Sequence, residues 1–316
     1  MKNIVAYRIY RWDQANQVLL DRVSSCIGDA ELIVLADESN GYLPVPEKYT
    51  TIRYTKNMEA YHLPSGPENN CLWWNVDYGL YVLKEKVAAD FYWMLDHDVI
   101  LPSRFYEIIE DVEQNQADFV ASHLRRASEN WRWYKTGELM EMDEEMRAAL
   151  LMIFGVSKRG IDALYQERLR IWQLLKEEPS SIFPKAKWPF CEVLLPNILK
   201  ESAGFKTIDL LNYRPDFDFS EYRVAHAKSF NNEKLYTETS FVHPVLTPDK
   251  ALTRLRRLTP YHELFDEKST LRALITEIMY EGKSFFSDLY NYYKDQGMSD
   301  YDEQRLLELA RKQKWN

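Results

Sequence analysis

Apolar and polar positions follow one another along the chain in blocks that predict strands and helices in turn. Residues 3–9 (NIVAYRI) form a mainly apolar run of strand length, and residues 31–36 (ELIVLA) form a second. Residues 13–23 lie between these runs and carry apolar side chains at helical spacing: Ala15, Val18, Leu19 and Val23. The second run ends in a turn composition at residues 37–41 (DESNG). This β–α–β order predicts an α/β fold.

The same block pattern continues through the rest of the chain. Further strands are expected at 51–54, 90–95, 118–122 and 205–210, and a strand or turn at 151–155. Further helices are expected at 72–87, 157–175 and 193–202, the last ended by Gly204 as a C-cap. Residues 128–149 are polar and rich in Trp, which is typical of a mobile loop or of a wall that contacts an acceptor. The pattern is helical from residue 248 onward.

Two aspartates directly follow the strand predicted at 90–95. Asp96 and Asp98 flank His97, and parallel sheets bind ligands outside the carboxyl ends of their strands. Alternate side chains of an extended segment share one side, so both carboxylates would face one divalent cation. Aspartate pairs also occur in solvated turns, which is the alternative interpretation. The apolar run before the pair favours the metal site.

Composition and charge narrow the class of ligand. The net charge of −9 argues against a nucleic-acid partner, because such a partner requires a basic surface. Aromatic residues make up 14% of the chain; most should fill the core, and some should line a groove for sugars or nucleobases. No apolar run approaches the ~18 residues of a membrane span. The three cysteines are far apart and match no disulfide or metal pattern, which favours a reducing, cytoplasmic location.

The ordered motifs resemble those of glycosyltransferases with the A-type fold. Residues 73–78 (WWNVDY) and 92–99 (YWMLDHDV) are similar to a W-N-x-D-Y helix followed by a strand that ends in an acid-x-Asp-Val motif. The resemblance covers residues 3–245. It implies a mixed, mostly parallel sheet flanked by helices over residues 1–247. Within it, residues 1–125 would form a nucleotide-binding half and residues 126–247 an acceptor half, with residues 248–316 as a helical C-terminal extension.

The resemblance also implies a metal centre. Asp98 would be the main metal ligand, and Asp96 would bind the metal through water or contact the donor ribose. His243 would be the third protein ligand, arriving from FVHP at residues 241–244. An imidazole favours Mn²⁺ over Mg²⁺. The alternative for His243 is a structural histidine before a turn bent by proline.

Glu192 is the candidate general base. An inverting glycosyltransferase must deprotonate the acceptor hydroxyl, and a carboxylate at the start of a helix can be fixed beside the anomeric carbon. The alternative is a carboxylate placed there by the helix dipole. In an enzyme that retains configuration, Glu192 would only position the acceptor; the inverting outcome is favoured.

Other polar residues are candidates for contacts with the donor. The resemblance points to Tyr7 and Arg8 at the end of the first strand, to Asp37 in the turn after the second, and to Asp77 and Asp96 for the nucleotide. His123 and Arg125 follow the strand at 118–122 and are candidates for contacts with the donor phosphate or sugar. Each of these residues also has an ordinary packing or surface interpretation.

One basic amphipathic segment lies near the C-terminal part of the chain. Residues 250–258 (KALTRLRRL) would suit the anionic inner face of a membrane and a lipid-linked acceptor. The alternative is a solvated helix face.

The leading hypothesis is a metal-dependent glycosyltransferase that uses a nucleotide diphosphate sugar, with a UDP-sugar favoured. Its acceptor would be a glycan or glycolipid in bacterial polysaccharide or lipopolysaccharide assembly. A nucleotidyltransferase is an alternative, although residues 7–12 contain no glycine where such enzymes carry a Gly-rich loop. A carbohydrate-binding or scaffold protein without catalysis is the alternative from another class.

Overall fold

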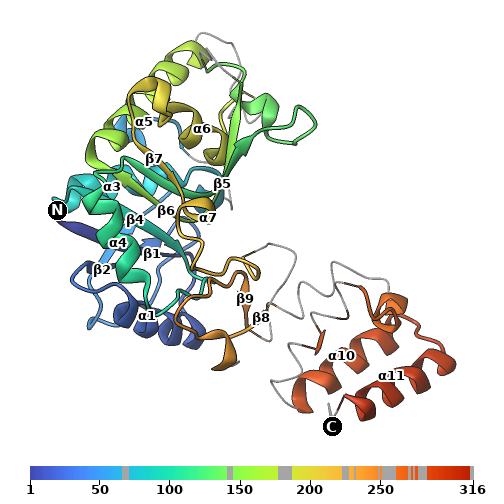
Figure 1. Cartoon of the computed structure of the whole chain (residues 1–316). Coiled ribbons are helices and arrows are strands. Elements are labelled where there is room, and N and C mark those ends of the chain that lie inside the picture. Colours follow the sequence, from blue (N-terminus) through green and yellow to red (C-terminus); the bar gives the residue numbers. More distant parts are fainter. Residues whose placement is uncertain are drawn as a thin grey trace. The chain divides into compact units, whose positions relative to one another are not determined.

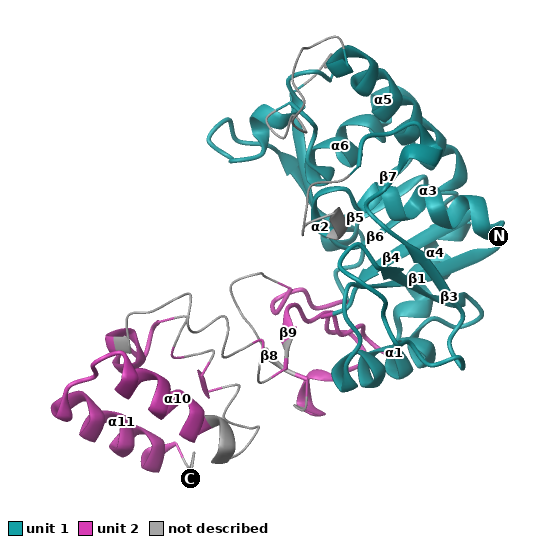
Figure 2. Cartoon of the chain, turned by 180° about the vertical axis from the view of Figure 1, so that it is seen from behind, with its two compact units in different colours: residues 1–97, 104–216 teal, residues 98–103, 217–316 magenta. Residues whose placement is uncertain are grey.

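A computed structural model describes most of the chain (Figure 1). The described residues are 1–65, 71–140, 145–176, 187–222, 228–230, 233–247, 250, 261–269, 272, 275–276 and 283–313. They divide into two compact units, residues 1–97 with 104–216 and residues 98–103 with 217–316, which Figure 2 draws in different colours.

The first unit contains a seven-stranded sheet with the order β3-β2-β1-β4-β6-β5-β7. Its strands are β1 (Asn3–Ile9), β2 (Glu31–Asp37), β3 (Thr51–Tyr54), β4 (Phe91–Asp96), β5 (Phe119–Arg126), β6 (Arg147–Ser157) and β7 (Thr207–Asp209). Only β6 is antiparallel to its neighbours, β4 and β5. The chain runs from β1 outward to β2 and β3 and then returns to β4 on the other side of β1. The carboxyl ends of β1 and β4 therefore form a topological switch point, where α/β sheets bind ligands.

Helices cover both faces of this sheet. They are α1 (Gln14–Cys26), α2 (Cys71–Trp74), α3 (Val76–Lys86), α4 (Phe105–Gln114), α5 (Lys158–Lys176), α6 (Cys191–Ile198) and α7 (Leu210–Tyr213). Helices α3, α5 and α6 share one apolar core with Ile4 of β1 and Met94 of β4. The ring of Trp93, on the opposite face of β4, packs against Phe105 of α4 at 5.3 Å. The expected α/β class, with a mixed and mostly parallel sheet between helices, is confirmed.

Several predicted bounds need correction. The helix expected at 72–87 is two helices, because Asn75 leaves helical geometry with ψ 61° between α2 and α3. The strand or turn expected at 151–155 is the longer β6, which begins at Arg147 inside the stretch expected to be a loop. Helix α6 ends at Ile198, and Gly204, with φ 80°, follows the separate 3-10 helix Glu201–Ala203.

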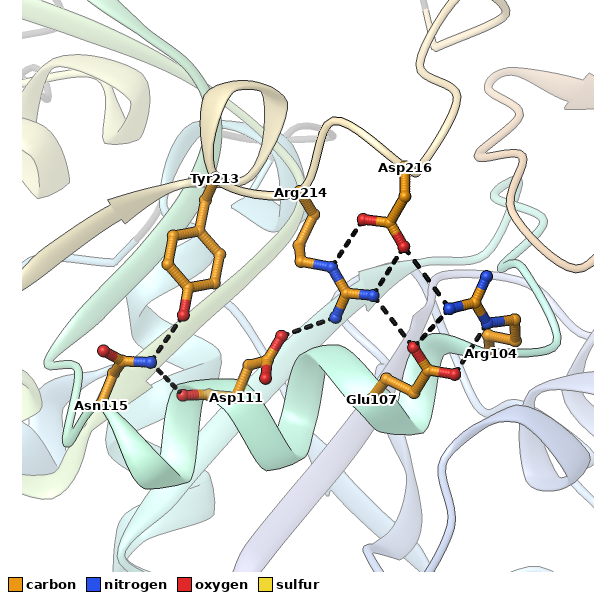
Figure 3. A network of polar contacts seen from close by, with 7 residues as sticks. All are labelled: Arg104, Glu107, Asp111, Asn115, Tyr213, Arg214 and Asp216. Carbon is orange, nitrogen blue, oxygen red and sulfur yellow. Dashed lines mark hydrogen bonds and ion pairs between the residues drawn. The ribbon is translucent and has the colours of Figure 1, made fainter.

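A network of ion pairs fastens α4 to the end of the first unit (Figure 3). The guanidinium of Arg214 donates to Asp111 at 2.6 Å, to Glu107 at 2.9 Å and to both carboxylate oxygens of Asp216 at 2.8 Å. Arg104 donates to Glu107 through two bonds of 2.7 Å and to Asp216 at 3.5 Å. Arg104 and Asp216, which lie beside two of the three crossings of the chain between the units, therefore belong to one network.

The second unit contains short strands, bridges and helices. Strands β8 (Lys228–Ser229) and β9 (Val245–Leu246) pair in parallel, and helices α10 (Lys283–Asp295) and α11 (Asp300–Lys312) pack in a separate apolar core with Leu264 and Ile275. The basic segment predicted at 250–258 lies outside the described residues apart from Lys250. Among the helices that the structure describes, none has the length and apolar character needed to cross a membrane.

Candidate functional site

The candidate site begins at the carboxyl ends of β1 and β4. These strands pair in parallel with Arg8 opposite Asp96. Arg8 is 1% exposed, and its guanidinium forms an ion pair with Asp96 and donates to the Leu151 carbonyl at 3.1 Å. A buried cation thus fixes the first carboxylate of the D-x-D motif. This contact gives Arg8 a role in positioning Asp96, besides the nucleotide contact expected from the sequence.

The turn after β4 is fixed by a tyrosine of β1. The Tyr7 hydroxyl donates to the His97 carbonyl at 2.8 Å, and the His97 ring lies edge-on to Tyr10 with centroids 4.8 Å apart. Strand β4 ends at Asp96, and His97 and Asp98 form a turn. The turn, and not the strand alternation expected from the sequence, therefore sets the direction of the second carboxylate. Tyr7 is fully buried, so the structure assigns its hydroxyl to this turn.

Main-chain pairing within the second unit places Asp98 beside His243. Ile100 and Val242 exchange hydrogen bonds of 3.0 and 3.2 Å, and the Val245 N–H donates to the Asp98 carbonyl at 2.8 Å. The Nε2 atom of His243 lies 3.6 Å from Oδ1 of Asp98. This distance is too long for a hydrogen bond. Two ligands of one divalent ion lie at most about 4 to 5 Å apart, because each ligand bond is about 2.0 to 2.6 Å long, depending on the ion. The pair therefore has the spacing of metal ligands.

Asp96 extends this pair to three potential ligands. One ligand atom from each of Asp96, Asp98 and His243 lies within 4.8 Å of the others. Two carboxylate oxygens and one imidazole nitrogen are donors that suit Mn²⁺, and the order of affinities for nitrogen and oxygen ligands does not exclude other divalent ions. Asp96, Asp98 and His243 could therefore hold a metal ion, and their role as ligands stays a prediction.

Glu192 lies in the first turn of α6 within the first unit. Burial raises the pKa of its carboxyl to about 7, against the charges of Arg125 and Arg132, which lower it, while Asp96 raises it further. A carboxylate placed only to suit the helix dipole would be stabilised in its charged form, which lowers the pKa. The raised value instead matches a group that takes up a proton near neutral pH.

Aromatic rings and arginines surround the start of α6. Phe190 stacks on Trp133 with centroids 4.4 Å apart, and Trp73 contacts Phe190 at 4.9 Å. The Arg132 guanidinium lies over Trp133 at 4.3 Å, while Trp73 itself is 44% exposed. The Trp-rich stretch expected as a loop or an acceptor wall thus contributes an aromatic surface next to the candidate base. In the sequence, only the Trp-rich composition of this stretch suggested a role for it, and composition did not single out Arg132.

His123 and Arg125 lie on an irregular part of β5. The pairing of β5 with β6 shifts register between Ser122 and Arg125, and His123 has a φ of 55°. Such bulges re-aim side chains near functional sites. Arg125 lines a cavity of about 390 Å³ with Leu124, Arg126, Glu145 and Arg147. The charge of Arg125 lowers the pKa of Glu192. The contact of Arg125 with a donor remains a prediction.

Asp37 and Asp77 already have partners inside the protein. Asp37 ends β2 and accepts the Ser39 N–H at 2.9 Å, closing its own turn. Asp77 is fully buried and receives two hydrogen bonds, of 2.8 and 2.9 Å, from Arg168, which is also fully buried. The Tyr81 hydroxyl donates to the same carboxylate at 2.8 Å. Both aspartates therefore stabilise the fold around the site, and sequence reasoning missed Arg168.

Neither a protein-family model nor a curated protein matches the sequence. Solved structures with a similar fold include a glycosyltransferase involved in glycosylation of the major capsid of PBCV-1, at 11% identity and a TM-score of 0.37, covering 78% of this chain and 94% of that one. Mouse xyloside xylosyltransferase 1 matches at 9% identity and a TM-score of 0.39, with 72% and 87% covered. CMP:2-keto-3-deoxy-manno-octonic acid synthetase complexed with CTP matches at 13% identity and 0.34, with 66% and 90% covered.

Proposed function

We propose that the protein is a metal-dependent glycosyltransferase that uses a nucleotide diphosphate sugar. Asp98 and His243, with Asp96, would hold a divalent cation that offsets the charge of the donor diphosphate. The observation that carries this proposal is the distance of 3.6 Å between His243 and Asp98, two residues 145 positions apart, which is the spacing of ligands around one ion.

Glu192 is the general base of the proposed reaction. Its carboxylate takes the proton of an acceptor hydroxyl while the hydroxyl oxygen bonds to the anomeric carbon of the donor. The bond from that carbon to the diphosphate oxygen breaks, and the nucleoside diphosphate leaves with the electron pair. The acceptor oxygen attacks the anomeric carbon on the face opposite the leaving diphosphate, and a single displacement of this kind inverts the configuration, so we propose an inverting outcome.

The finer parts of the proposal rest on the sequence resemblance. They are a UDP-sugar as donor, Mn²⁺ as the ion, and a glycan or lipid-linked glycan as acceptor in polysaccharide or lipopolysaccharide assembly. A cytoplasmic location and a membrane contact through residues 250–258 belong to the same proposal, as do donor contacts by Tyr7, Arg8, Asp37, His123 and Arg125.

A binding and turnover experiment tests the proposal. UDP with Mn²⁺ should raise the melting temperature of the protein, and a UDP-sugar should be hydrolysed slowly in the presence of the metal. Asp98→Asn should remove both effects, whereas Asp295→Asn, an exposed aspartate of α10, should leave them intact. No stabilisation by any nucleoside diphosphate with metal would contradict the proposal.

Local structure at the first helix disfavours the nucleotidyltransferase alternative. Asp13 caps α1 by accepting the Asn16 N–H at 2.9 Å. The carboxylate therefore occupies the helix N-terminus at which a phosphate would bind in a phosphate-binding loop. The carbohydrate-binding alternative predicts sugar binding without metal-dependent turnover, and the same assay separates it from the enzyme.

A further inference from the structure

The four residues before Glu192 are fixed by contacts to distant parts of the first unit. The indole N–H of Trp188 donates to Asn75 at 2.9 Å, and the Pro189 carbonyl accepts from Arg168 at 2.8 Å. The Phe190 N–H donates to the Thr136 hydroxyl at 3.0 Å, and the Cys191 thiol donates to the Trp73 carbonyl at 3.2 Å. Every residue of this segment is thus bonded to a partner outside α6.

Arg168 connects Asp77 of α3 to Pro189 through its rigid guanidinium group. Two nitrogens of its guanidinium donate to the Asp77 carboxylate, and the third donates to the Pro189 carbonyl. Its planar face also lies over the Trp188 ring at 4.5 Å. A guanidinium presents its donors in a fixed fork, so the position of Asp77 determines the position of Pro189.

This geometry gives the W-N-x-D-Y motif a physical role. Trp73 contributes its carbonyl, Asn75 its amide oxygen and Asp77 its carboxylate, and each one reaches the segment at 188–191 directly or through Arg168. Helix α6 has no side-chain cap of its own. The start of the helix therefore depends on these contacts for its position.

We propose that Asn75, Asp77, Thr136 and Arg168, here called the clamp residues, are positioning residues that set the place of the Glu192 carboxylate. The proposal rests on the proposed role of Glu192 as base. The clamp residues are buried or act through the segment at 188–191, and Asp77, whose carboxylate is taken up by Arg168 and Tyr81, is assigned to positioning and not to the donor.

Mild variants test the clamp without removing a buried charge. Arg168→Lys keeps the positive charge beside Asp77 but lacks the fork that also reaches Pro189. Trp188→Phe keeps a ring and removes the donor to Asn75, and Thr136→Val removes the acceptor for Phe190 with little change of shape. Each variant should lower kcat by about 10- to 100-fold, because a small displacement of a catalytic group is costly. The KM for the donor should stay within about twofold.

The matched control is Arg159→Lys on the same helix, α5. Arg159 also donates two hydrogen bonds to one aspartate, Asp118, and one to a carbonyl, that of Gly204, at 3.0 Å. The control changes the same chemistry without a contact to the segment at 188–191. It should reduce stability somewhat and leave kcat unchanged.

A second measurement does not depend on turnover. The Glu192 carboxyl can be titrated by ¹³C NMR in metal-free protein, with Glu192→Gln used to assign the signal. We expect a midpoint near 7 in the wild type. The midpoint should fall in the clamp variants, as the carboxyl gains water, and stay in Arg159→Lys.

The outcomes separate the clamp from the proposed function. Wild-type kcat and an unchanged Glu192 midpoint in Arg168→Lys, Trp188→Phe and Thr136→Val would overturn the clamp. Wild-type kcat in Glu192→Gln would instead remove the proposed base, and the NMR midpoints would then decide the clamp alone.

Discussion

At the scale of single residues, the environment of Glu192 determines its chemistry. Its place in the first turn of a helix would by itself favour the charged form. Burial and the nearby Asp96 oppose that effect and raise the pKa to about 7, although Arg125 and Arg132 act in the other direction. Desolvation is therefore the stronger influence at this position.

The raised pKa of Glu192 predicts the pH dependence of transfer. A base must be deprotonated to accept a proton, so kcat/KM should rise with pH through about 7 and level off above it. Glu192→Gln should lower kcat by about 10²- to 10⁴-fold and abolish the rise. Steady-state rates from pH 5 to 9 measure this, with Glu201→Gln, an exposed glutamate of the first unit, as control. A rise of the same shape in Glu192→Gln would assign it to another group.

His243 allows a direct test of the metal centre at the same scale. Its Nε2 lies 3.6 Å from the Asp98 carboxylate, so the two side chains can share an ion. His243→Ala should weaken Mn²⁺ binding by at least about 10-fold, since even the outer partners of metal ligands contribute that much. Electron paramagnetic resonance of free Mn²⁺ measures the affinity, and His262→Ala, at an exposed position, is the control. Equal Mn²⁺ affinity in His243→Ala and the wild type would exclude the ligand role.

At the scale of elements, the packing of β4 against β6 requires a glycine. A Cβ atom on Gly155 would lie 2.3 Å from the Phe91 ring and 3.1 Å from the Trp93 ring. These rings occupy the space that a side chain would need. Gly155→Ala should therefore lower the free energy of unfolding by about 1–3 kcal/mol, measured by denaturant titration.

A double-mutant cycle separates this clash from other causes. Phe91→Leu removes the ring that approaches Gly155, so Gly155→Ala should cost less in the Phe91→Leu background than in the wild type. An equal cost in both backgrounds would show that the ring of Phe91 is not the obstacle.

The same elements show what the sequence can and cannot predict. The apolar runs at β1, β2 and β4 are long and end in clear turns, so their position was predicted within about a residue. The run inside β6 is equally apolar, but an apolar run does not specify strand direction or register, and the antiparallel pairing of β6 depends on the tertiary structure. Its start at Arg147 was missed because the polar residues before it looked like a loop.

The residues of the candidate site likewise differ in how far the sequence predicts them. Asp96 and Asp98 could be named as candidate ligands because they directly follow an apolar strand, and His243 because of the resemblance to A-type glycosyltransferases. The burial of Asp77 against Arg168 could not, since a charged side chain on a helix is more often exposed than buried. The pKa of Glu192 and the contacts of the clamp residues likewise depend on residues distant in the chain.

At the scale of the whole molecule, the chain crosses between its two units at residues 97–98, 103–104 and 216–217. Arg104 begins a stretch of the first unit and Asp216 ends one, and both belong to the network around Arg214 (Figure 3). The network lies within the first unit. It keeps two ends of that unit side by side whatever the arrangement of the second unit.

The charges of this network predict how acid weakens the first unit. Hydrogen bonds from Arg104 and then Arg214 lower the pKa of Glu107 to about 2, and Arg214 lowers that of Asp216 to about 2. A carboxylate with a lowered pKa contributes stability above its unfolded pKa of about 4, and this contribution disappears as pH falls toward 2. Arg214→Gln should thus be less stable than the wild type at pH 7, with a difference that shrinks steadily below about pH 4.

Urea unfolding of the first unit at several pH values measures this difference. Both carboxylates are partly exposed, so solvent reduces the effect, and the acid midpoint of Arg214→Gln should move up by a fraction of a pH unit. Arg305→Gln removes one exposed ion pair of α11 in the second unit and serves as control. A stability difference that stays constant from pH 7 to pH 2 would mean that Arg214 contributes through packing and not through its charge. In that case the aliphatic part of the Arg214 side chain would contribute the stability, through van der Waals contacts with α4. Arg214→Met would then be at least as stable as Arg214→Gln.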